Sequence, residues 1–224
     1  MTDDIIPDVE FSDNKSQRLP CAIVLDASGS MAGKPIEELN AGLKVLEEAL
    51  KDDPIAKKRV QLLLITIGGV KDVTVIRDWI DAMDFSAPTL EAHGLTPLGA
   101  GVRLALEKIE EQKEQYKQAD ITYNRPWLFI ITDGEPNDEG WKTVAAEAQI
   151  YESEEKVIVW PIGVQDADME KLQLFSRKTA VKLKGLNFKE LFLWLSKSAS
   201  VASRAESDSS AQSAPPNDWM EIPT

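Results

Sequence analysis

Short runs of apolar residues alternate along the chain with longer segments in which apolar residues recur every three or four positions. The apolar runs predict buried strands at residues 19–26, 60–67, 127–132 and 156–163, and shorter strands at 73–76 and 180–183. The periodic segments predict helices that begin near residues 36, 98, 141, 168 and 188. Strands that alternate with helices imply parallel pairing with right-handed crossovers. The pattern therefore predicts an α/β fold with a doubly wound, mostly parallel central sheet flanked by helices.

Both ends of the chain lack this pattern. Residues 1–18 are polar and acidic, which predicts a flexible N-terminal segment before a domain at 19–203. Residues 204–224 begin as a serine-rich stretch that cannot bury enough apolar surface to order itself, so we expect a flexible tail. The tail ends in Trp219, Met220 and Ile222, where we expect no core to bury the tryptophan. This end either docks on an apolar groove of the domain or of a partner, or it stays unbound.

The composition of the chain argues against nucleic acid as a partner and against an oxidising compartment. The 224 residues carry a formal net charge of −13, and the lysines are interspersed with glutamates, so no basic patch is available for nucleic acid. The single cysteine, Cys21, lies in the first predicted strand and excludes an internal disulfide framework, which fits a reducing cytoplasm. We see neither a signal-peptide pattern nor an apolar run of membrane-spanning length, and expect a cytoplasmic protein without membrane contact.

Polar oxygen-bearing residues follow the first strand directly. Asp26, Ser28 and Ser30 come after the apolar run at 21–25. Open α/β sheets place ligand sites at the carboxyl ends of their strands. One carboxylate and two hydroxyls suit Mg²⁺ or Mn²⁺ better than zinc. The alternative interpretation is a serine-rich turn that caps the following helix.

Two later segments repeat this arrangement. Thr96 lies in a turn before a helical pattern, and Asp133 follows the strand at 127–132. Asp-x-Ser-x-Ser, a distant Thr and a strand that ends in Thr-Asp-Gly resemble the metal-ion-dependent adhesion site (MIDAS) of von Willebrand factor A (VWA) domains. The resemblance spans roughly residues 19 to 203, and it implies a central first strand and one antiparallel edge strand. It further implies that Ser28, Ser30 and Thr96 touch the ion, while Asp26 and Asp133 hold its waters.

Within that family the chain resembles the bacterial tellurium-resistance TerY-like group. The matching features are residues 26–33, Ile36, Leu39, Asn40, residues 94–99 and residues 132–138. The chain departs from many relatives at Gly68 and Gly69, where they carry an aromatic residue. The resemblance implies a metal-dependent protein-binding adaptor of a stress-response or tellurite-resistance system, with a protein kinase and a PP2C-type phosphatase as partners. We expect a monomer that is not an enzyme.

An enzymatic alternative uses the same region. Ser28 or Ser30 could form a hydrolase triad with His93, the only histidine, and one aspartate. The chain has no Gly-x-Ser-x-Gly elbow, and Asp26 is better explained as a metal-site residue. It also has no Gly-x-x-x-x-Gly-Lys loop that would bind the phosphates of a nucleotide.

Overall fold

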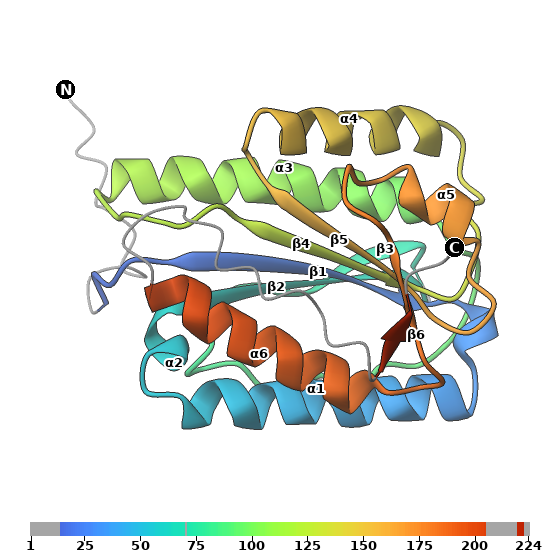
Figure 1. Cartoon of the computed structure of the whole chain (residues 1–224), viewed down its shortest axis with the longest axis horizontal. Helices are drawn as coiled ribbons and strands as arrows, with labels where there is room; N and C mark the ends of the chain where they lie inside the picture. The colour runs from blue at the N-terminus through green and yellow to red at the C-terminus, as the bar shows by residue number, and fades with distance from the viewer. Residues whose placement is uncertain (1–13, 70, 205–218, 222–224) are drawn as a thin grey trace.

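A computed structural model of the protein describes residues 14–69, 71–204 and 219–221. Within these residues seven strands form one sheet, in the order β3-β2-β1-β4-β5-β6-β7 (Figure 1). The strands are β1 (Leu19–Ala27), β2 (Val60–Gly68), β3 (Val73–Asp81), β4 (Trp127–Thr132), β5 (Ile158–Gly163), β6 (Val181–Leu183) and β7 (Met220–Glu221). All neighbouring strands pair in parallel except β3 and β7, which are antiparallel at the two edges. The predicted fold class is confirmed.

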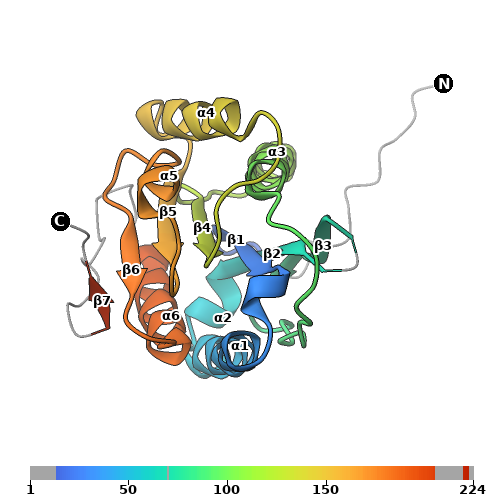
Figure 2. The same ribbon diagram turned by 90° about the vertical axis from the view of Figure 1, so that its right-hand side faces the viewer.

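Helices cover both faces of the sheet (Figure 2). One face carries α1 (Lys34–Asp52), α2 (Ala56–Arg59) and α6 (Phe188–Arg204), and the other carries α3 (Leu98–Gln118), α4 (Trp141–Ser153) and α5 (Met169–Gln173). The apolar residues of α1 recur at steps of three and four, which places them on one side of the helix, against the sheet and α6. Gly42 of α1 lets α6 approach closely, because a Cβ there would lie 2.8 Å from Phe188 and Phe192.

The first strand lies inside the sheet and is buried along its whole length. Side chains alternate between the two faces of a strand, so Cys21, Ile23 and Leu25 pack toward α1 and α6. Ala22 and Val24 pack toward α3 instead. Burial on both faces explains why β1 is continuously apolar rather than alternating. Because β1 and β4 are parallel neighbours, their carboxyl ends meet at the same edge of the sheet.

Two predicted elements differ from the observed ones in length. The edge strand β3 runs to Asp81 rather than ending near residue 76, because its pairing with β2 continues to Asp81. Arg77 and Asp78 interrupt the apolar pattern, so the sequence does not show this part of the strand. Helix α6 runs to Arg204, past its last large apolar residues, since its serines are buried and Arg59 donates a hydrogen bond to the Ser203 carbonyl. Helix α5 is short and begins at Met169, directly after Asp168, whose side chain accepts a bond from the Lys171 amide.

Residues 219–221 dock on the domain itself, which is one of the alternatives that the sequence left open. Trp219 is only 8% exposed, its ring lies 6.0 Å from the ring of Trp194, and the next two residues form β7. The expectation that no core would bury Trp219 is wrong, because Trp219 packs against Trp194 of α6 and belongs to the same apolar cluster as Val181 and Leu183 of β6. Residues 205–218 and 222–224 lie outside the described residues, and their mobility stays a prediction. Of the N-terminal segment, residues 14–18 are described, and Arg18 is fully buried there.

Candidate metal site

The five predicted site residues lie at the edge of the sheet formed by the carboxyl ends of the parallel strands, either at the end of a strand or in the loops beyond it. Asp26 is the penultimate residue of β1, and Asp133 directly follows β4. Ser28 precedes a short 3-10 turn, Gly29–Met31, which contains Ser30. Thr96 lies two residues before the start of α3. Residues separated by up to about a hundred positions are thus brought to one edge of the sheet by its parallel topology.

Hydrogen bonds join four of the five residues directly. The hydroxyl oxygens of Ser28 and Ser30 lie 3.0 Å apart, and the Ser30 hydroxyl donates to Asp133 Oδ1 at 2.7 Å. The backbone amide of Ser28 donates to Asp26 Oδ1 at 2.8 Å. The aspartate of β1, both serines and the aspartate after β4 therefore form one connected set of oxygen atoms.

The fifth residue, Thr96, lies against the same set by packing. It is 6% exposed, and a Cβ at Gly134 would be 3.0 Å from the Thr96 hydroxyl, so this hydroxyl faces the turn after Asp133. The Thr96 carbonyl accepts bonds from the amides of Leu98 at 2.8 Å and Asn137 at 3.2 Å. These bonds fix the threonine between the start of α3 and the loop that follows β4.

Backbone bonds connect the β1, β2 and Thr96 loops. The Gly29 amide donates to the Gly94 carbonyl at 3.0 Å, and the His93 amide donates to the Ala27 carbonyl at 2.8 Å. The Gly69 amide in turn donates to the His93 carbonyl at 2.6 Å. Gly68 has φ +80°, and a Cβ there would lie 2.6 Å from the Ser28 nitrogen. Gly68 is thus what lets the end of β2 pass beside the site.

The two carboxylates are buried without a basic partner. Asp26 is fully buried and Asp133 is 8% exposed, and among the described residues neither forms an ion pair with Lys, Arg or His. Burial raises the pKa of Asp26, while hydrogen bonds from Ser28 and Thr132 oppose this and the charge of Asp133 adds to it. Burial also raises the pKa of Asp133, and the hydrogen bond from Ser30 opposes it. Both carboxylates would be stabilised by a cation.

The donor atoms decide which cation fits. Among the residues that the structure describes, no group of three or more His, Cys, Asp and Glu side chains is placed to hold a metal. A site at this edge must therefore use hydroxyls together with the carboxylates of Asp26 and Asp133. An all-oxygen set of this kind fits a hard divalent ion. The residues present thus fit the metal that the sequence motif implies.

Thr132 is a site residue that we did not single out from the sequence. Its hydroxyl donates to Asp26 Oδ2 at 2.5 Å and accepts a bond from the Gly134 amide at 3.1 Å. It therefore orients the carboxylate of Asp26 and the turn that carries Asp133. Its signal was present in the sequence, as the threonine of Thr-Asp-Gly at the end of β4.

Two further polar residues, Asp138 and Asn40, form hydrogen bonds to backbone groups of distant segments. Nothing in the sequence around either residue predicts these contacts. Asp138 accepts bonds from the amides of Gly99 at 3.1 Å and Ala100 at 2.8 Å, at the start of α3. The Asn40 side chain on α1 accepts from the Leu90 amide at 2.8 Å and donates to the Leu90 carbonyl at 3.0 Å. Their partners lie about 40 to 50 positions away in the chain, which only the tertiary structure reveals.

His93 does not complete a hydrolase triad. Its side chain is 57% exposed, and Nε2 lies 3.7 Å from a carboxylate oxygen of Glu91. In the described part of the chain no hydrogen bond joins its ring to Ser28 or Ser30, whose hydroxyls contact each other and Asp133. The geometry gives the enzymatic alternative no support.

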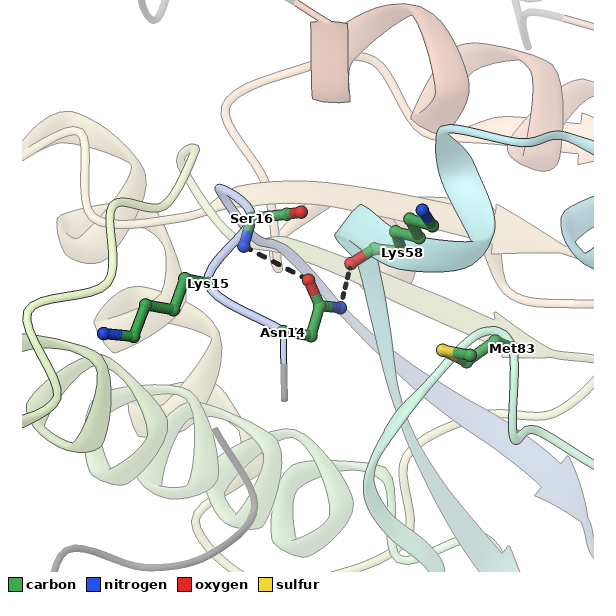
Figure 3. A pocket seen from close by; sticks show the side chains of 5 residues that line it. All are labelled: Asn14, Lys15, Ser16, Lys58 and Met83. Atoms are coloured by element: carbon green, nitrogen blue, oxygen red, sulfur yellow. Dashed lines mark hydrogen bonds between the residues drawn. The ribbon is translucent and has the colours of Figure 1, made fainter. Parts of the chain in front are cut away.

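A separate cavity of about 450 Å³ lies at the amino end of β1, at the opposite end of the sheet. Its lining consists of Asn14, Lys15, Ser16, Lys58 and Met83 (Figure 3). The Asn14 side chain crosses it to the Lys58 carbonyl at 2.7 Å, while the two lysine side chains extend in different directions. None of the five predicted site residues lines this cavity.

Comparison with known proteins identifies the family. The family model for the von Willebrand factor type A domain matches residues 22–190, which is most of the chain. The chain belongs to the von Willebrand factor type A family. Metal-dependent protein binding of the MIDAS type is a common function of this family.

Individual relatives are distant. An uncharacterised protein, sll0103 from Synechocystis sp. (strain ATCC 27184 / PCC 6803 / Kazusa), is 27% identical over 161 residues, which cover 69% of this chain and 34% of that protein. This chain thus spans about a third of the length of that relative. In the described residues no helix is long and apolar enough to cross a membrane.

Solved structures share the fold at low identity. The SpaC pilus adhesin of Lactobacillus rhamnosus GG in its open conformation has a TM-score of 0.65 at 15% identity, covering 84% of this chain and 31% of that chain. A von Willebrand factor type A protein from Catenulispora acidiphila has a TM-score of 0.57 at 17% identity, covering 83% and 43%. Proximal thread matrix protein 1 of the mussel byssus, with a zinc-occupied MIDAS motif, has a TM-score of 0.54 at 14% identity, covering 83% and 48%.

Proposed function

We propose that this VWA domain is a metal-dependent protein-binding module that uses the MIDAS-type site to hold an acidic group of a protein partner. The observation that carries the proposal is the pair of buried carboxylates, Asp26 and Asp133, without a basic partner in the described chain and joined by hydroxyl groups. A divalent cation would offset the cost of burying these charges.

Mg²⁺ or Mn²⁺ is the cation that we propose for this site. Ser28, Ser30 and Thr96 would supply neutral oxygen ligands, and Asp26 and Asp133 would act through water. Magnesium favours oxygen ligands and gives up its waters reluctantly, which suits carboxylates that bind the ion through a bridging water. A mussel relative holds zinc at its MIDAS motif, so zinc belongs in the same titration. Because zinc binds most sites more tightly than Mn²⁺, the test is whether Mg²⁺ or Mn²⁺ binds at all; a response to zinc alone would contradict our choice of metal but not the site.

The chemistry of the ligands supports an acidic partner group. Direct contact through neutral hydroxyls leaves most of the positive charge on the ion, available to an oxygen anion at an open coordination position. The chain itself carries a net charge of −13, so an acidic partner would be repelled at long range. The contact therefore depends on the bound cation, and we expect chelation to abolish it.

We further propose that the protein is not an enzyme and acts as an adaptor. The exposed side chain of His93 and the mutual contacts of Ser28 and Ser30 support this. The TerY-like motifs support a role in bacterial stress response or tellurite resistance, with a protein kinase and a PP2C-type phosphatase as partners. The buried free thiol of Cys21 supports a reducing, cytoplasmic compartment.

The experiment that tests the site is thermal denaturation with and without chelator. A ligand that binds only the folded state stabilises it in proportion to the logarithm of its concentration. We expect Mg²⁺ or Mn²⁺ to raise the Tm of the wild-type chain, and Asp133→Ala and Ser28→Ala to abolish the increase. His93→Ala is the matched control and should keep it. An unchanged metal response in Asp133→Ala would refute the site.

The experiment that tests the adaptor role uses affinity capture in a tellurite-exposed bacterium that carries the gene. The wild-type chain with Mg²⁺ should retain a kinase or a phosphatase, and the Asp133→Ala chain should not. Recovery of the same partners by Asp133→Ala would show that the metal site does not carry the contact. Purified protein that hydrolyses ester or phosphate substrates, and loses this activity on Ser28→Ala, would contradict the non-enzymatic assignment.

A further inference from the structure

The edge of the sheet at β6 is completed by a segment from the very end of the described chain. On one side β6 pairs in parallel with β5, and on the other it pairs antiparallel with β7, with Leu183 opposite Met220 and Lys182 opposite Glu221. The Lys184 amide donates to the Trp219 carbonyl at 2.9 Å. Without β7, the outer hydrogen-bonding groups of β6 would form an open edge, which readily pairs with any extended segment.

Side chains anchor this segment more firmly than its length suggests. Trp219 and Met220 are 8% and 4% exposed, although they are two of only three described residues beyond Arg204. The Trp219 ring lies 6.0 Å from Trp194 of α6, and Trp194 lies 5.2 Å edge-on to Trp160 of β5. A buried tryptophan that packs on a second one, itself packed on a third, is the kind of anchor that dominates peptide binding. Figure 2 shows β7 outside β6, beside α6.

Charge also matches across this edge. Lys182 and Lys184 lie on or just after β6, and Glu221 lies opposite Lys182 in the ladder. Opposite charges directly across an antiparallel pair stabilise it. The sequence of the C-terminal segment contains two acidic residues, Asp218 and Glu221. On a chain with a net charge of −13, this lysine-bearing edge is a place where an acidic segment is locally attracted.

The 14 residues between α6 and Trp219 are long enough to allow the segment to dock at β6, but their length does not force it to dock there. Residues 205–218 separate the end of α6 from Trp219, and a chain of that length can reach as far as about 50 Å. The segment is therefore placed by its own contacts with β6 and Trp194, as a tethered ligand is. For a linker of this length the effective concentration of the segment is on the order of millimolar.

We propose that β6 and Trp194 form a peptide-binding groove, separate from the metal site, and that the C-terminal segment is its resident, exchangeable ligand. When this segment is released, the groove accepts a partner's segment of the same chemistry, an extended acidic stretch in which Trp precedes an aliphatic residue. The proposal does not depend on the metal-site function.

The test uses the full-length chain and a fluorescent peptide with the sequence of residues 215–224. Trp219→Ala removes the anchor of the resident segment and should leave the groove open. We expect the peptide to bind the Trp219→Ala chain at least about tenfold more tightly than the wild-type chain, whose own segment competes. A peptide with alanine in place of its tryptophan should not bind. Chelator should change neither result, which separates this groove from the metal site.

A cleavable form of the wild-type chain serves as a second test that does not depend on whether the Trp219→Ala variant folds. A protease site placed within residues 205–218 of the wild-type sequence allows the connection to be cut after folding. The cut protein should exchange its own segment for the labelled peptide. Concentration-dependent dimers of the wild-type chain that Trp219→Ala does not form would also support the groove. Equal binding to wild type and variant, or no binding to either the folded variant or the cut protein, would overturn the proposal.

Discussion

Replacing Gly68 by alanine tests how the end of β2 positions the metal site. Gly68 has φ +80°, and an added Cβ would lie 2.6 Å from the Ser28 nitrogen and 2.8 Å from the His93 carbonyl oxygen. Both neighbours are backbone atoms, so the clash cannot be relieved by a change of side-chain rotamer. To restore a contact of 3.4 Å, the Ser28 backbone must move by about 0.8 Å.

The expected loss of stability has two parts. A left-handed backbone costs an alanine about 1–2 kcal/mol relative to glycine. The added contact costs about 1–3 kcal/mol more, as overpacking of a close-packed site does. For a chain of this size 1 kcal/mol shifts the Tm by about 2–4 °C, so the Gly68→Ala protein should melt roughly 4–20 °C below wild type.

The effect on metal binding follows from the shift of Ser28. Magnesium holds its ligands at about 2.0–2.1 Å, so a displacement of about 0.8 Å removes this hydroxyl from direct contact. At a metal concentration of about 100 times Kd, wild type gains about 2.7 kcal/mol. A tenfold loss of affinity would leave about 1.4 kcal/mol. We therefore expect the metal-induced rise in Tm to fall by about half or more.

Gly140→Ala is the matched control. Gly140 also has φ +80°, but a Cβ there would meet nothing within 4 Å. It should lose only the backbone part, about 1–2 kcal/mol, and keep the whole metal response. Calorimetry of both variants, with and without Mn²⁺, measures the two effects together. Equal destabilisation of the two variants would refute the steric argument, and a full metal response in Gly68→Ala would show that Ser28 need not be held there.

Three further predictions concern polar groups that take part in hydrogen bonds within the fold. Burial raises the pKa of Asp26 and Asp133 above the unfolded value near 3.8, so the metal-free folded state takes up protons at a higher pH than the unfolded state does. The stability of the metal-free wild-type chain, relative to that of Asp26→Asn, should therefore rise as the pH falls from 7. Metal affinity should fall over the same range, and thermal denaturation with and without metal measures both trends. Asp138→Ala removes the acceptor for two amides at the start of α3 and should cost about 1 kcal/mol, against less for the asparagine variant. Tyr116→Phe should cost about 1 kcal/mol in urea unfolding, because its hydroxyl donates to the buried Gln61 side chain.

The sequence alone determined the interior of the sheet. Strands β1, β2, β4 and β5 are buried on both faces, so each appears as a continuous apolar run that does not depend on its neighbours. The five site residues were also readable, because each lies beside a strand end or a helix start that the pattern already predicted. For these features the local signal and the final structure agree.

Only the tertiary structure decided what lies at the edges and around the site. The outer half of β3 is ordered by pairing with β2, and the segment at Trp219 by pairing with β6, which lies much earlier in the chain; neither segment carries a strong local pattern. Asp138 and Asn40 act on backbone groups about 40 to 50 residues away, so their roles depend on distances that no window of sequence contains. Burial of Trp219 likewise required the surface that α6 and β6 form together, which exists only after the chain has folded.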